Sequence, residues 1–439
     1  MAHFDEDARY LVDVHIVHGF CQIDDGNLAK LERKAAAYGN IMLHAASVEP
    51  TWDVSGVHHA KMMILFRYDD MAQIVIHTAN MTSQDWNDTR NMIWCSPWLP
   101  RLVQPPPGCQ AYAEPAAAVG LAFQADLMEY LRAYNECAGT LGTLPGRLGA
   151  YDFSAVRAAL VASVPGRYRV NGPRRGRWGL LGLAQQLCRV EVAPGDSDVV
   201  VQVPSIATLG SKDTWLKGCL HAALAATATA REHVPGAPEP SLKILFPTAD
   251  DIRRSVGGYG AGAGILTTLS TPQHTKQLAY LRPLLHRWGA GILDSQASAH
   301  GDAARPWTGL GRRPICHAKT YVRRAQGGNI EWALMTSADL SRQAWGHPPS
   351  GARGKMYLPS WELGVLIWPS MFGRNAQMAA TTNADLPSQS GPGSPDVLVG
   401  VRLPYTTPLC PYEADDIPWI ASRDYDKPDC LGQWWRGRS

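Results

Sequence analysis

Apolar residues recur along the chain with two different periods, which predict strands separated by helices. Short apolar runs bounded by polar or turn-forming residues predict strands at 10–17, 41–44, 62–66, 74–77, 198–203, 242–246, 333–335 and 363–367. Helical spacing predicts helices at 27–38 and 122–135, and the second carries Leu127, Leu131 and Tyr134 on one face. Strands that alternate with helices indicate a layered α/β architecture.

The predicted elements fall into two unequal groups that meet near residue 152. We expect an N-terminal half at 1–152 and a C-terminal half at 153–439. Stretches rich in Gly, Ser and Pro interrupt the pattern, and they lie at 104–108, 257–264, 297–311 and 387–395. The last of these favours a surface loop.

Composition leaves ample material for a core and excludes several classes of protein. Of the 439 residues, 45% are hydrophobic and 18% are charged, which excludes intrinsic disorder. The net charge is only +2, so a polyanion site has to come from local clustering of basic residues. No apolar run approaches the roughly 18 residues that cross a bilayer, and no signal-peptide pattern is visible. We therefore expect an intracellular protein that makes no membrane contact.

The nine cysteines are scattered and form no CxxC pair. This distribution argues against a disulfide framework and against a zinc finger.

An internal repeat is the most informative feature of the sequence. The first copy has His59 and Lys61 in an HxK tripeptide, then Asn80, then Trp86 six residues later. The second copy has the same order, with His317, Lys319, Asp339 and Trp345. The interval from His to Asn or Asp is 21 positions in one copy and 22 in the other. This agreement predicts duplicated halves that face each other across a pseudo-twofold axis.

The HxK tripeptides suit phosphodiester chemistry. Positions two apart on an extended strand point to the same face, so each His projects together with its Lys. If the two faces meet, two imidazoles and two ammonium groups surround one small volume. The lysines neutralise non-bridging oxygens, while one His attacks phosphorus and the other protonates the leaving oxygen. No metal is needed for this reaction.

Two other interpretations of the tripeptides are less favoured. A single HxK is common on solvated surfaces and carries no information, but duplication with the same downstream residues does. Metal binding by His77, Cys316 and His317 is the second alternative, and no carboxylate or cysteine pair supports it.

Further motifs accompany both copies over nearly the whole chain. In the first half they lie at 57–63, 77–80 and 96–97, and in the second at 164–167, 205–210, 258–262, 317–323, 336–346, 360–365, 416–418 and 429–435. With these motifs the sequence resembles the tyrosyl-DNA phosphodiesterases of the phospholipase-D superfamily. General phospholipases and nucleases of that superfamily carry an Asp five residues after the Lys. Here Phe66 and Arg324 stand at those positions, which favours the tyrosyl-DNA branch.

The resemblance implies a fold and a mechanism. The fold is α/β, with two similar α-β-α layered halves that contain mixed sheets and are related by a pseudo-twofold axis. His59 is the expected nucleophile, which forms a phosphohistidine with the 3′ phosphate of DNA. His317 is the expected general acid for the tyrosine phenol and then the base that activates water. Lys61 and Lys319 bind the non-bridging oxygens, and no cofactor is implied.

The resemblance also assigns supporting roles, with one substitution in each half. Asn80 is expected to donate to the phosphate oxygens. Asn91, where the family usually has Gln, and Glu362 are expected to hold the imidazoles, each reaching across the axis to the histidine of the other half. Asp339 replaces the usual Asn of the second motif.

Contacts with the substrate are implied on both sides of the scissile bond. The candidates for DNA contact are Ser205, Thr208, Arg342 and Trp52, and Trp435 is the candidate on the peptide side. Ser55 occupies the position where the family has an aromatic residue that stacks on DNA, and the nearby Trp52 is the candidate substitute. Compared with the family, the chain starts late: the first strand, with a Tyr that touches the peptide, and the regulatory tail have no counterpart.

The function implied is repair of 3′-blocked DNA in the nucleus. The expected partners are DNA with 3′ adducts, at single-stranded or duplex ends, and the topoisomerase I-derived peptide on it. The expected product is a 3′-phosphate, and the chain is expected to act as a monomer. Two alternatives stay open at this point: a phospholipase-type or nuclease-type hydrolase with the same His pair, or a DNA-end-binding module in which Asp339 weakens catalysis.

Overall fold

The computed structural model describes most of the chain. The described residues are 12–19, 26–46, 56–102, 115–138, 142–171, 176–228, 239–265, 267, 269–288, 313–347, 354–381, 396–405 and 407–437. The predicted loops at 104–108, 297–311 and 387–395 lie outside these ranges. Among the helices of the described residues, none has the length and hydrophobicity of a membrane span.

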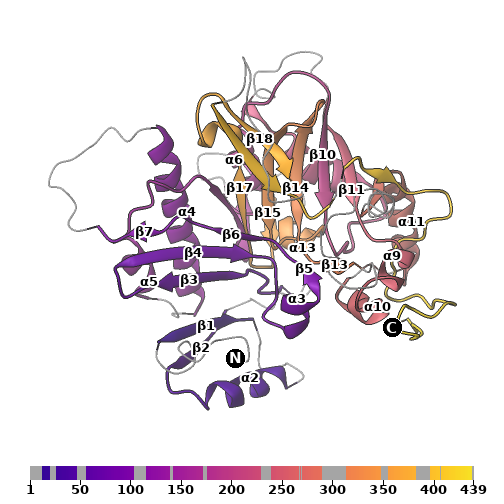
Figure 1. Cartoon of the computed structure of the whole chain (residues 1–439), viewed down its shortest axis with the longest axis horizontal. Coiled ribbons are helices and arrows are strands. Elements are labelled where there is room, and N and C mark those ends of the chain that lie inside the picture. Colours follow the sequence, from indigo (N-terminus) through magenta and orange to yellow (C-terminus); the bar gives the residue numbers. More distant parts are fainter. Residues whose placement is uncertain are drawn as a thin grey trace, which may run out of the picture.

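The first half contains a small antiparallel sheet with helices beside it (Figure 1). Its elements are β1 (Val14–His18), α2 (Asn27–Ala35), β2 (Ile41–Ala45), β3 (Met62–Phe66), β4 (Met71–His77), α3 (Ser83–Asn87), β5 (Thr89–Arg90), β6 (Ile93–Cys95), β7 (Leu99–Pro100), α4 (Pro115–Ala138) and α5 (Leu144–Leu148). The sheet has the order β3-β4-β6, with β7 also on β4, while β1 and β2 form a separate parallel pair. The apolar face of α4 packs on this sheet: Phe123 and Leu127 share one buried cluster with Ile74 and Ile76, and the rings of Phe123 and Trp94 have centroids 5.3 Å apart.

The second half is built on an eight-stranded mixed sheet. The strands of this half are β8 (Ala159–Ser163), β9 (Gly166–Arg169), β10 (Ser197–Gln202), β11 (Ser241–Leu245), β12 (Leu285–Arg287), β13 (Ile315–Cys316), β14 (Thr320–Ala325), β15 (Ile330–Thr336), β16 (Lys355–Leu358), β17 (Glu362–Ile367), β18 (Ala376–Thr381), β19 (Val397–Arg402) and β20 (Cys410–Pro411). Among them, β9 pairs with β16 and β18 with β19 in separate two-stranded sheets. The order of the eight-stranded sheet is β20-β12-β11-β10-β14-β15-β17-β8, in which β10, β11 and β12 are parallel and the other neighbours antiparallel.

Short helices lie around this sheet. They are α6 (Leu180–Leu187), a π-helix (Leu216–His221), α7 (Ala222–Leu224), α9 (Ala249–Arg253), α10 (Gly258–Ala261), α11 (Pro272–Leu281), α13 (Arg342–Trp345) and three 3₁₀ turns (Gly262–Gly264, Arg282–Leu284 and Pro369–Met371). The glycine-rich stretch at 257–264 thus forms α10 and a 3₁₀ turn.

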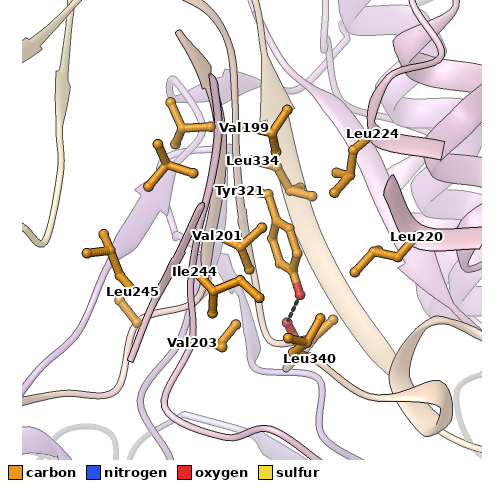
Figure 2. Close-up of a cluster of buried hydrophobic side chains, with 14 of the residues drawn as sticks. Val199, Val201, Val203, Leu220, Leu224, Ile244, Leu245, Tyr321, Leu334 and Leu340 are labelled. Atoms are coloured by element: carbon orange, nitrogen blue, oxygen red, sulfur yellow. Dashed lines mark hydrogen bonds between the residues drawn. The ribbon is translucent and has the colours of Figure 1, made fainter. Parts of the chain in front are cut away.

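The large sheet is buried on both faces, as its nearly continuous apolar strands require. Figure 2 shows Val199 and Val201 of β10, with Val203 just after this strand, beside Tyr321 of β14. The Tyr321 hydroxyl donates a hydrogen bond of 3.2 Å to the carbonyl of Ala338, which ties this core to the loop after β15. Packed side chains of this core therefore hold the second-copy motif in place.

The two halves repeat one strand pattern, as the duplicated motifs predicted. In each half the strand after the HxK tripeptide pairs antiparallel with the next strand, which pairs with a third: β3-β4-β6 corresponds to β14-β15-β17. The halves also pair directly, through β5 with β13 and through a bridge between His58 and Trp361. The ring of Tyr134 from α4 stacks on Trp361 with centroids 3.9 Å apart.

Every predicted strand overlaps an observed one, but element boundaries differ. The helix predicted at 27–38 ends at Ala35, and the helix predicted at 122–135 is part of the longer α4. The expected division at residue 152 falls between α5 and β8, although Phe153 and Val156 beyond it still pack in the core of the first half.

Candidate active site

Each histidine segment is held by the backbone of the opposite half. The amide of His59 donates to the carbonyl of Trp361 at 3.0 Å, and the amide of His317 donates to the carbonyl of Arg90 at 2.8 Å. Because each carbonyl belongs to the other copy, folding of both halves brings the two imidazoles to one interface. The expected convergence of the tripeptides is confirmed.

Glu362 holds the ring of His59 across this interface. Its Oε2 lies 3.0 Å from Nδ1 of His59. The same oxygen accepts from the hydroxyl of Ser337 at 2.5 Å, and that hydroxyl accepts from the amide of Leu363 at 2.9 Å. Burial alone would raise the pKa of Glu362, but the charge of His59 and its hydrogen bond, with Lys61 and Ser337, lower the pKa below its ordinary value. Glu362 is therefore a carboxylate that occupies Nδ1 of His59, which leaves Nε2 as the nitrogen that can react.

Asn91 does not make the matching contact in the first half. Its Oδ1 accepts from the hydroxyl of Thr78 at 3.0 Å, and its Nδ2 donates to Thr89 Oγ1 and to the carbonyl of Asp85, both at 2.8 Å. The carboxamide is thus fully engaged inside its own half. The expected contact of Asn91 with His317 is wrong, because Asn is one methylene shorter than Gln or Glu and ends short of the interface.

A carboxylate that sequence reasoning missed lies at the position where that contact was expected. Asp85 Oδ2 is 3.2 Å from Nδ1 of His317, although the angle is not that of a hydrogen bond. The same oxygen accepts from the backbone amide of Asn80 at 2.6 Å. A signal was present in the repeat, since Asp85 directly precedes Trp86 whereas Ala344 precedes Trp345 in the other copy.

The two lysines are buried beside their histidines. Lys61 Nζ donates to the carbonyl of His59 at 2.6 Å, and Lys319 Nζ donates to the carbonyl of His317 at 3.0 Å. Burial, followed by repulsion from Lys319, lowers the pKa of Lys61 to about 7. Two ammonium groups in so small a volume form a site that an anion stabilises.

The second histidine is neutral in the free site. Burial, then the charges of Lys319, Lys61 and His59, lower the pKa of His317 well below its ordinary value. Lys319 Nζ lies 3.1 Å from Nε2 of His317. When that lysine is an ammonium group, it can only donate, so Nε2 accepts and the ring proton resides on Nδ1.

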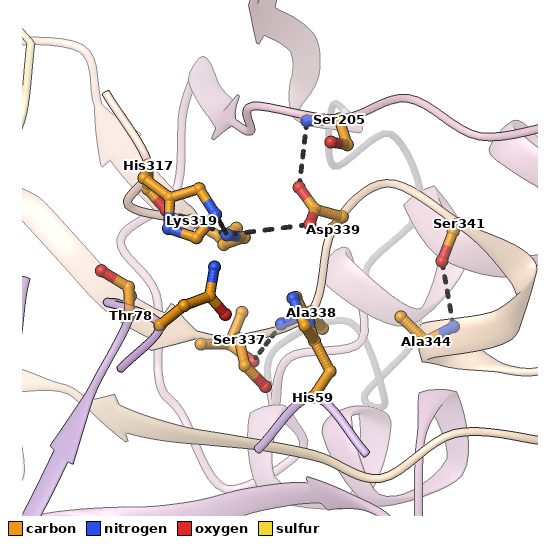
Figure 3. A network of polar contacts seen from close by, with 12 residues as sticks. His59, Thr78, Ser205, His317, Lys319, Ser337, Ala338, Asp339, Ser341 and Ala344 are labelled. Atoms are coloured by element: carbon orange, nitrogen blue, oxygen red, sulfur yellow. Dashed lines mark hydrogen bonds and ion pairs between the residues drawn. The ribbon is translucent and has the colours of Figure 1, made fainter. Parts of the chain in front are cut away.

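Asp339 and Asn80 occupy equivalent positions in the two motifs. Figure 3 shows Asp339 between Ser205 and Lys319: its Oδ1 accepts from the amide of Ser205 at 3.0 Å, and its Oδ2 is 3.8 Å from Lys319 Nζ. Burial raises the pKa of Asp339, against the opposing charges of Lys319 and His59. The side chain of Asn80 makes no hydrogen bond to any described residue, so its amide is available to a phosphate oxygen.

This geometry agrees with what the chain is similar to. A family model described as tyrosyl-DNA phosphodiesterase matches residues 1–413. The chain belongs to this family. Tyrosyl-DNA phosphodiesterase 1 of Arabidopsis thaliana is 28% identical, over 96% of this chain and 67% of the relative. The probable tyrosyl-DNA phosphodiesterase of Schizosaccharomyces pombe is 26% identical, over 97% of this chain and 85% of the relative. The crystal structure of the yeast tyrosyl-DNA phosphodiesterase superposes with a TM-score of 0.60 at 19% identity, over 94% of this chain and 87% of that one. That likeness confirms the expected phospholipase-D-like fold.

Two of the four expected DNA-contact residues, Ser205 and Thr208, lie on one loop beside Asp339. The backbone of Ser205 is bound by Asp339, and the hydroxyl of Thr208 lies 2.9 Å from Nε2 of His274 on the surface. Arg342 Nη2 donates to the carbonyl of Leu209, so this guanidinium stabilises the loop that carries Ser205 and Thr208. Trp52, the expected stacking residue, lies outside the described residues. DNA contact by these residues stays a prediction.

Trp435, expected on the peptide side, is a packing residue in this structure. It is 7% exposed, lies against Trp419 and Tyr259, and donates from its indole nitrogen to the carbonyl of Ala421 at 3.0 Å. Its ring therefore offers almost no surface to a peptide. The neighbouring Trp434 is 56% exposed and is the better-placed aromatic side chain of this segment.

Proposed function

We propose that the chain hydrolyses 3′-phosphotyrosyl ends on DNA through a phosphohistidine on His59 and leaves a 3′-phosphate. One observation carries this proposal: Glu362 fixes Nδ1 of His59 at an interface that also holds His317, Lys61 and Lys319. Family membership supports the substrate class.

The reaction follows from the groups at the interface. Nε2 of His59 attacks phosphorus, and the P–N bond forms as the bond to the tyrosine oxygen breaks. A bound phosphodiester favours the imidazolium form of His317, which takes up a proton from solution at Nε2. Nε2 gives this proton to the departing phenolate and then takes a proton from water. The water oxygen attacks phosphorus, the P–N bond breaks, and His59 is restored. Lys61, Lys319 and Asn80 compensate the charge on the non-bridging oxygens during both steps.

The finer assignments belong to the same proposal. We infer that the DNA is an end with a 3′ adduct, single-stranded or duplex, and that the leaving group includes peptide remaining from topoisomerase I. Both HxK tripeptides are on one chain, so a monomer completes its own site. From such a substrate we infer a nuclear location.

The test is incubation of the purified chain with a 3′-phosphotyrosyl oligonucleotide in EDTA, followed by gel electrophoresis. The expected result is conversion to a 3′-phosphate oligonucleotide, with none in the His59→Ala variant. Phosphatidylcholine is the comparison substrate, and faster cleavage of this lipid contradicts the proposal. Tight binding of the oligonucleotide without turnover contradicts it as well and indicates an end-binding module.

A further inference from the structure

The two halves build the same support for a histidine, but only one support reaches its target. In each half a hydroxyl after the central strand accepts from a backbone amide and donates to a side chain at the start of the third strand or just before it, and these hydroxyls belong to Thr78 and Ser337. In the second half that side chain is Glu362, which reaches His59. In the first half it is Asn91, whose shorter side chain remains in its own half.

Asp85 stands where the shorter Asn91 leaves Nδ1 of His317 without a side-chain hydrogen bond. Asp85 belongs to α3, and its backbone amide donates to the N-cap hydroxyl of Thr82 at 3.3 Å. Its Oδ2 accepts from the amide of Asn80 and lies 3.2 Å from Nδ1 of His317. The side chains of Asp85 and His317 are 12% and 11% exposed, so water screens this pair little.

The position is specific to one copy of the repeat. The residue before the repeated Trp is Asp85 in the first half and Ala344 in the second. A carboxylate at this position therefore occurs in the half with the shorter Asn91, and none occurs in the half where Glu362 already serves. The two acids lie on different elements, α3 and β17, yet each approaches Nδ1 of a histidine from the opposite half.

We propose that Asp85 is the positioning residue of His317: it keeps the proton on Nδ1, directs Nε2 to the phosphate and stabilises the imidazolium. The proposal rests on the proposed function, in which His317 acts as acid and base. The two atoms are already within hydrogen-bond distance at 3.2 Å, and such contacts often tighten in the substrate complex. The backbone of Thr78 also faces the ring, and its hydrogen bond raises the pKa of His317, but it bears no full charge, so a carboxylate stabilises an imidazolium more strongly.

Kinetics with two leaving groups test the role. The substrates are oligonucleotides with 3′-phosphotyrosine and with 3′-(4-nitrophenyl) phosphate, whose phenol needs less help from an acid. For Asp85→Ala we expect cleavage of the tyrosyl substrate to fall about 10- to 100-fold, the range for a lost hydrogen bond to a charged group. The nitrophenyl substrate should lose less in the first step, and the covalent adduct should accumulate because water still needs a base.

A second-site change separates positioning from a structural role. In Asp85→Ala/Asn91→Gln the amide is one methylene longer, so it should reach His317 and restore at least several-fold of the lost rate. Asp85→Asn keeps an acceptor for the Asn80 amide and preserves the fold if the Ala variant melts. Equal losses on both substrates, with no rescue by Asn91→Gln, overturn the proposal. Asp85 would then have only a structural role, as the acceptor for the backbone amide of Asn80.

A readout without substrate distinguishes this inference from the proposed function. Nitrogen NMR of the imidazoles at pH 8, with the His317 signals assigned by their loss in His317→Asn, reports which ring nitrogen bears the proton. Lys319 at Nε2 and Asp85 at Nδ1 both favour Nδ1–H in the native chain. In Asp85→Ala only the lysine remains, so we expect the share of Nε2–H to rise. An unchanged tautomer in Asp85→Ala overturns the positioning role even if tyrosyl-DNA cleavage is confirmed. The expected change supports it even if the substrate is a different phosphodiester.

Discussion

Glu362 Oε2 lies 3.0 Å from Nδ1 of His59, although 303 positions of the chain separate the two residues. The carboxylate belongs to β17 of the second half, and the histidine precedes β3 of the first. The proposed nucleophile of one half is therefore oriented by the carboxylate of the other. Under the proposed mechanism, both copies of the motif contribute to one catalytic unit.

Removing this contact should slow the attack on phosphorus more than it destabilises the fold. For Glu362→Ala we expect the single-turnover rate of covalent adduct formation to fall about 10- to 100-fold, as for loss of a hydrogen bond to a charged group. Glu362→Gln keeps an acceptor at the same length and should lose less. Quench-flow with a 3′-phosphotyrosyl oligonucleotide gives the rate, and thermal melting gives stability. Equal adduct rates in the native chain and in Glu362→Ala would show that the ring of His59 is oriented by other contacts.

Substitution of the two histidines should give different outcomes. His59→Ala should form no adduct because the nucleophile is absent. His317→Asn should slow the second step more than the first when the leaving group is a phenol with a pKa of about 10, since water still needs a base. A covalent enzyme–DNA species should then accumulate on a denaturing gel. If the adduct appears with His59→Ala and not with His317→Asn, the roles of the two residues are reversed.

Much of the fold and the four central residues could be predicted because their signals are local and repeated. The strands around each HxK tripeptide are short apolar runs, and the same order of His, Lys, Asn or Asp and Trp occurs twice. Glu362 followed from family resemblance, and the structure places it on His59 as expected. The helix limits were less accurate, since packing of α4 against a sheet extends it beyond its regular apolar stretch.

The missed features depend on side-chain length and three-dimensional approach. Asn91 occupies the predicted position, but the loss of one methylene turns its carboxamide back to Thr78 and Thr89. Asp85 has the sequence signature of an ordinary acid in the first turn of a helix, after the N-cap Thr82. Only the pairing of β5 with β13 brings α3 to His317 and gives that acid a second contact.

Binding of the phosphate product should be accompanied by proton uptake at Lys61. The pKa of this lysine is about 7 in the free site, so at pH 8 it is largely neutral. A bound phosphate favours the ammonium form and raises that pKa, which requires a proton from solution. Calorimetry of a 3′-phosphate oligonucleotide in buffers of different ionisation enthalpy should show uptake at pH 8 and less at pH 6, where Lys61 is already charged.

Arginine variants isolate the contribution of Lys61. Lys61→Arg keeps the charge but cannot titrate in this range, so its proton uptake at pH 8 should fall below that of the native chain. Lys217→Arg is the matched control, because Lys217 is 70% exposed on the π-helix and pairs with Asp213. Uptake that is the same in the native chain and in Lys61→Arg would assign the proton to another group.

Asp339 stands at the position where the family has Asn. An ionised carboxylate about 4 Å from a phosphate costs roughly 4 kcal/mol at an effective dielectric of 20, so the working site must relieve this repulsion. Burial raises the pKa of Asp339, and Oδ1 already accepts from the amide of Ser205, which leaves Oδ2 to carry a proton toward the substrate. We expect the protonated acid to donate to phosphate as Asn would.

The pH dependence follows from this protonation. As pH rises through the raised pKa of Asp339, the acid ionises and activity should fall. Asp339→Asn has no such transition, since its Oδ1 still accepts from Ser205 and its amide nitrogen donates at every pH. Its kcat/KM should therefore exceed that of the native chain at neutral pH, and any decline that remains at higher pH belongs to groups such as Lys61. Superimposable basic limbs in the two pH–rate profiles would instead show a charged Asp339 that pairs with Lys319, whose Nζ is 3.8 Å away, and is directed away from the phosphate.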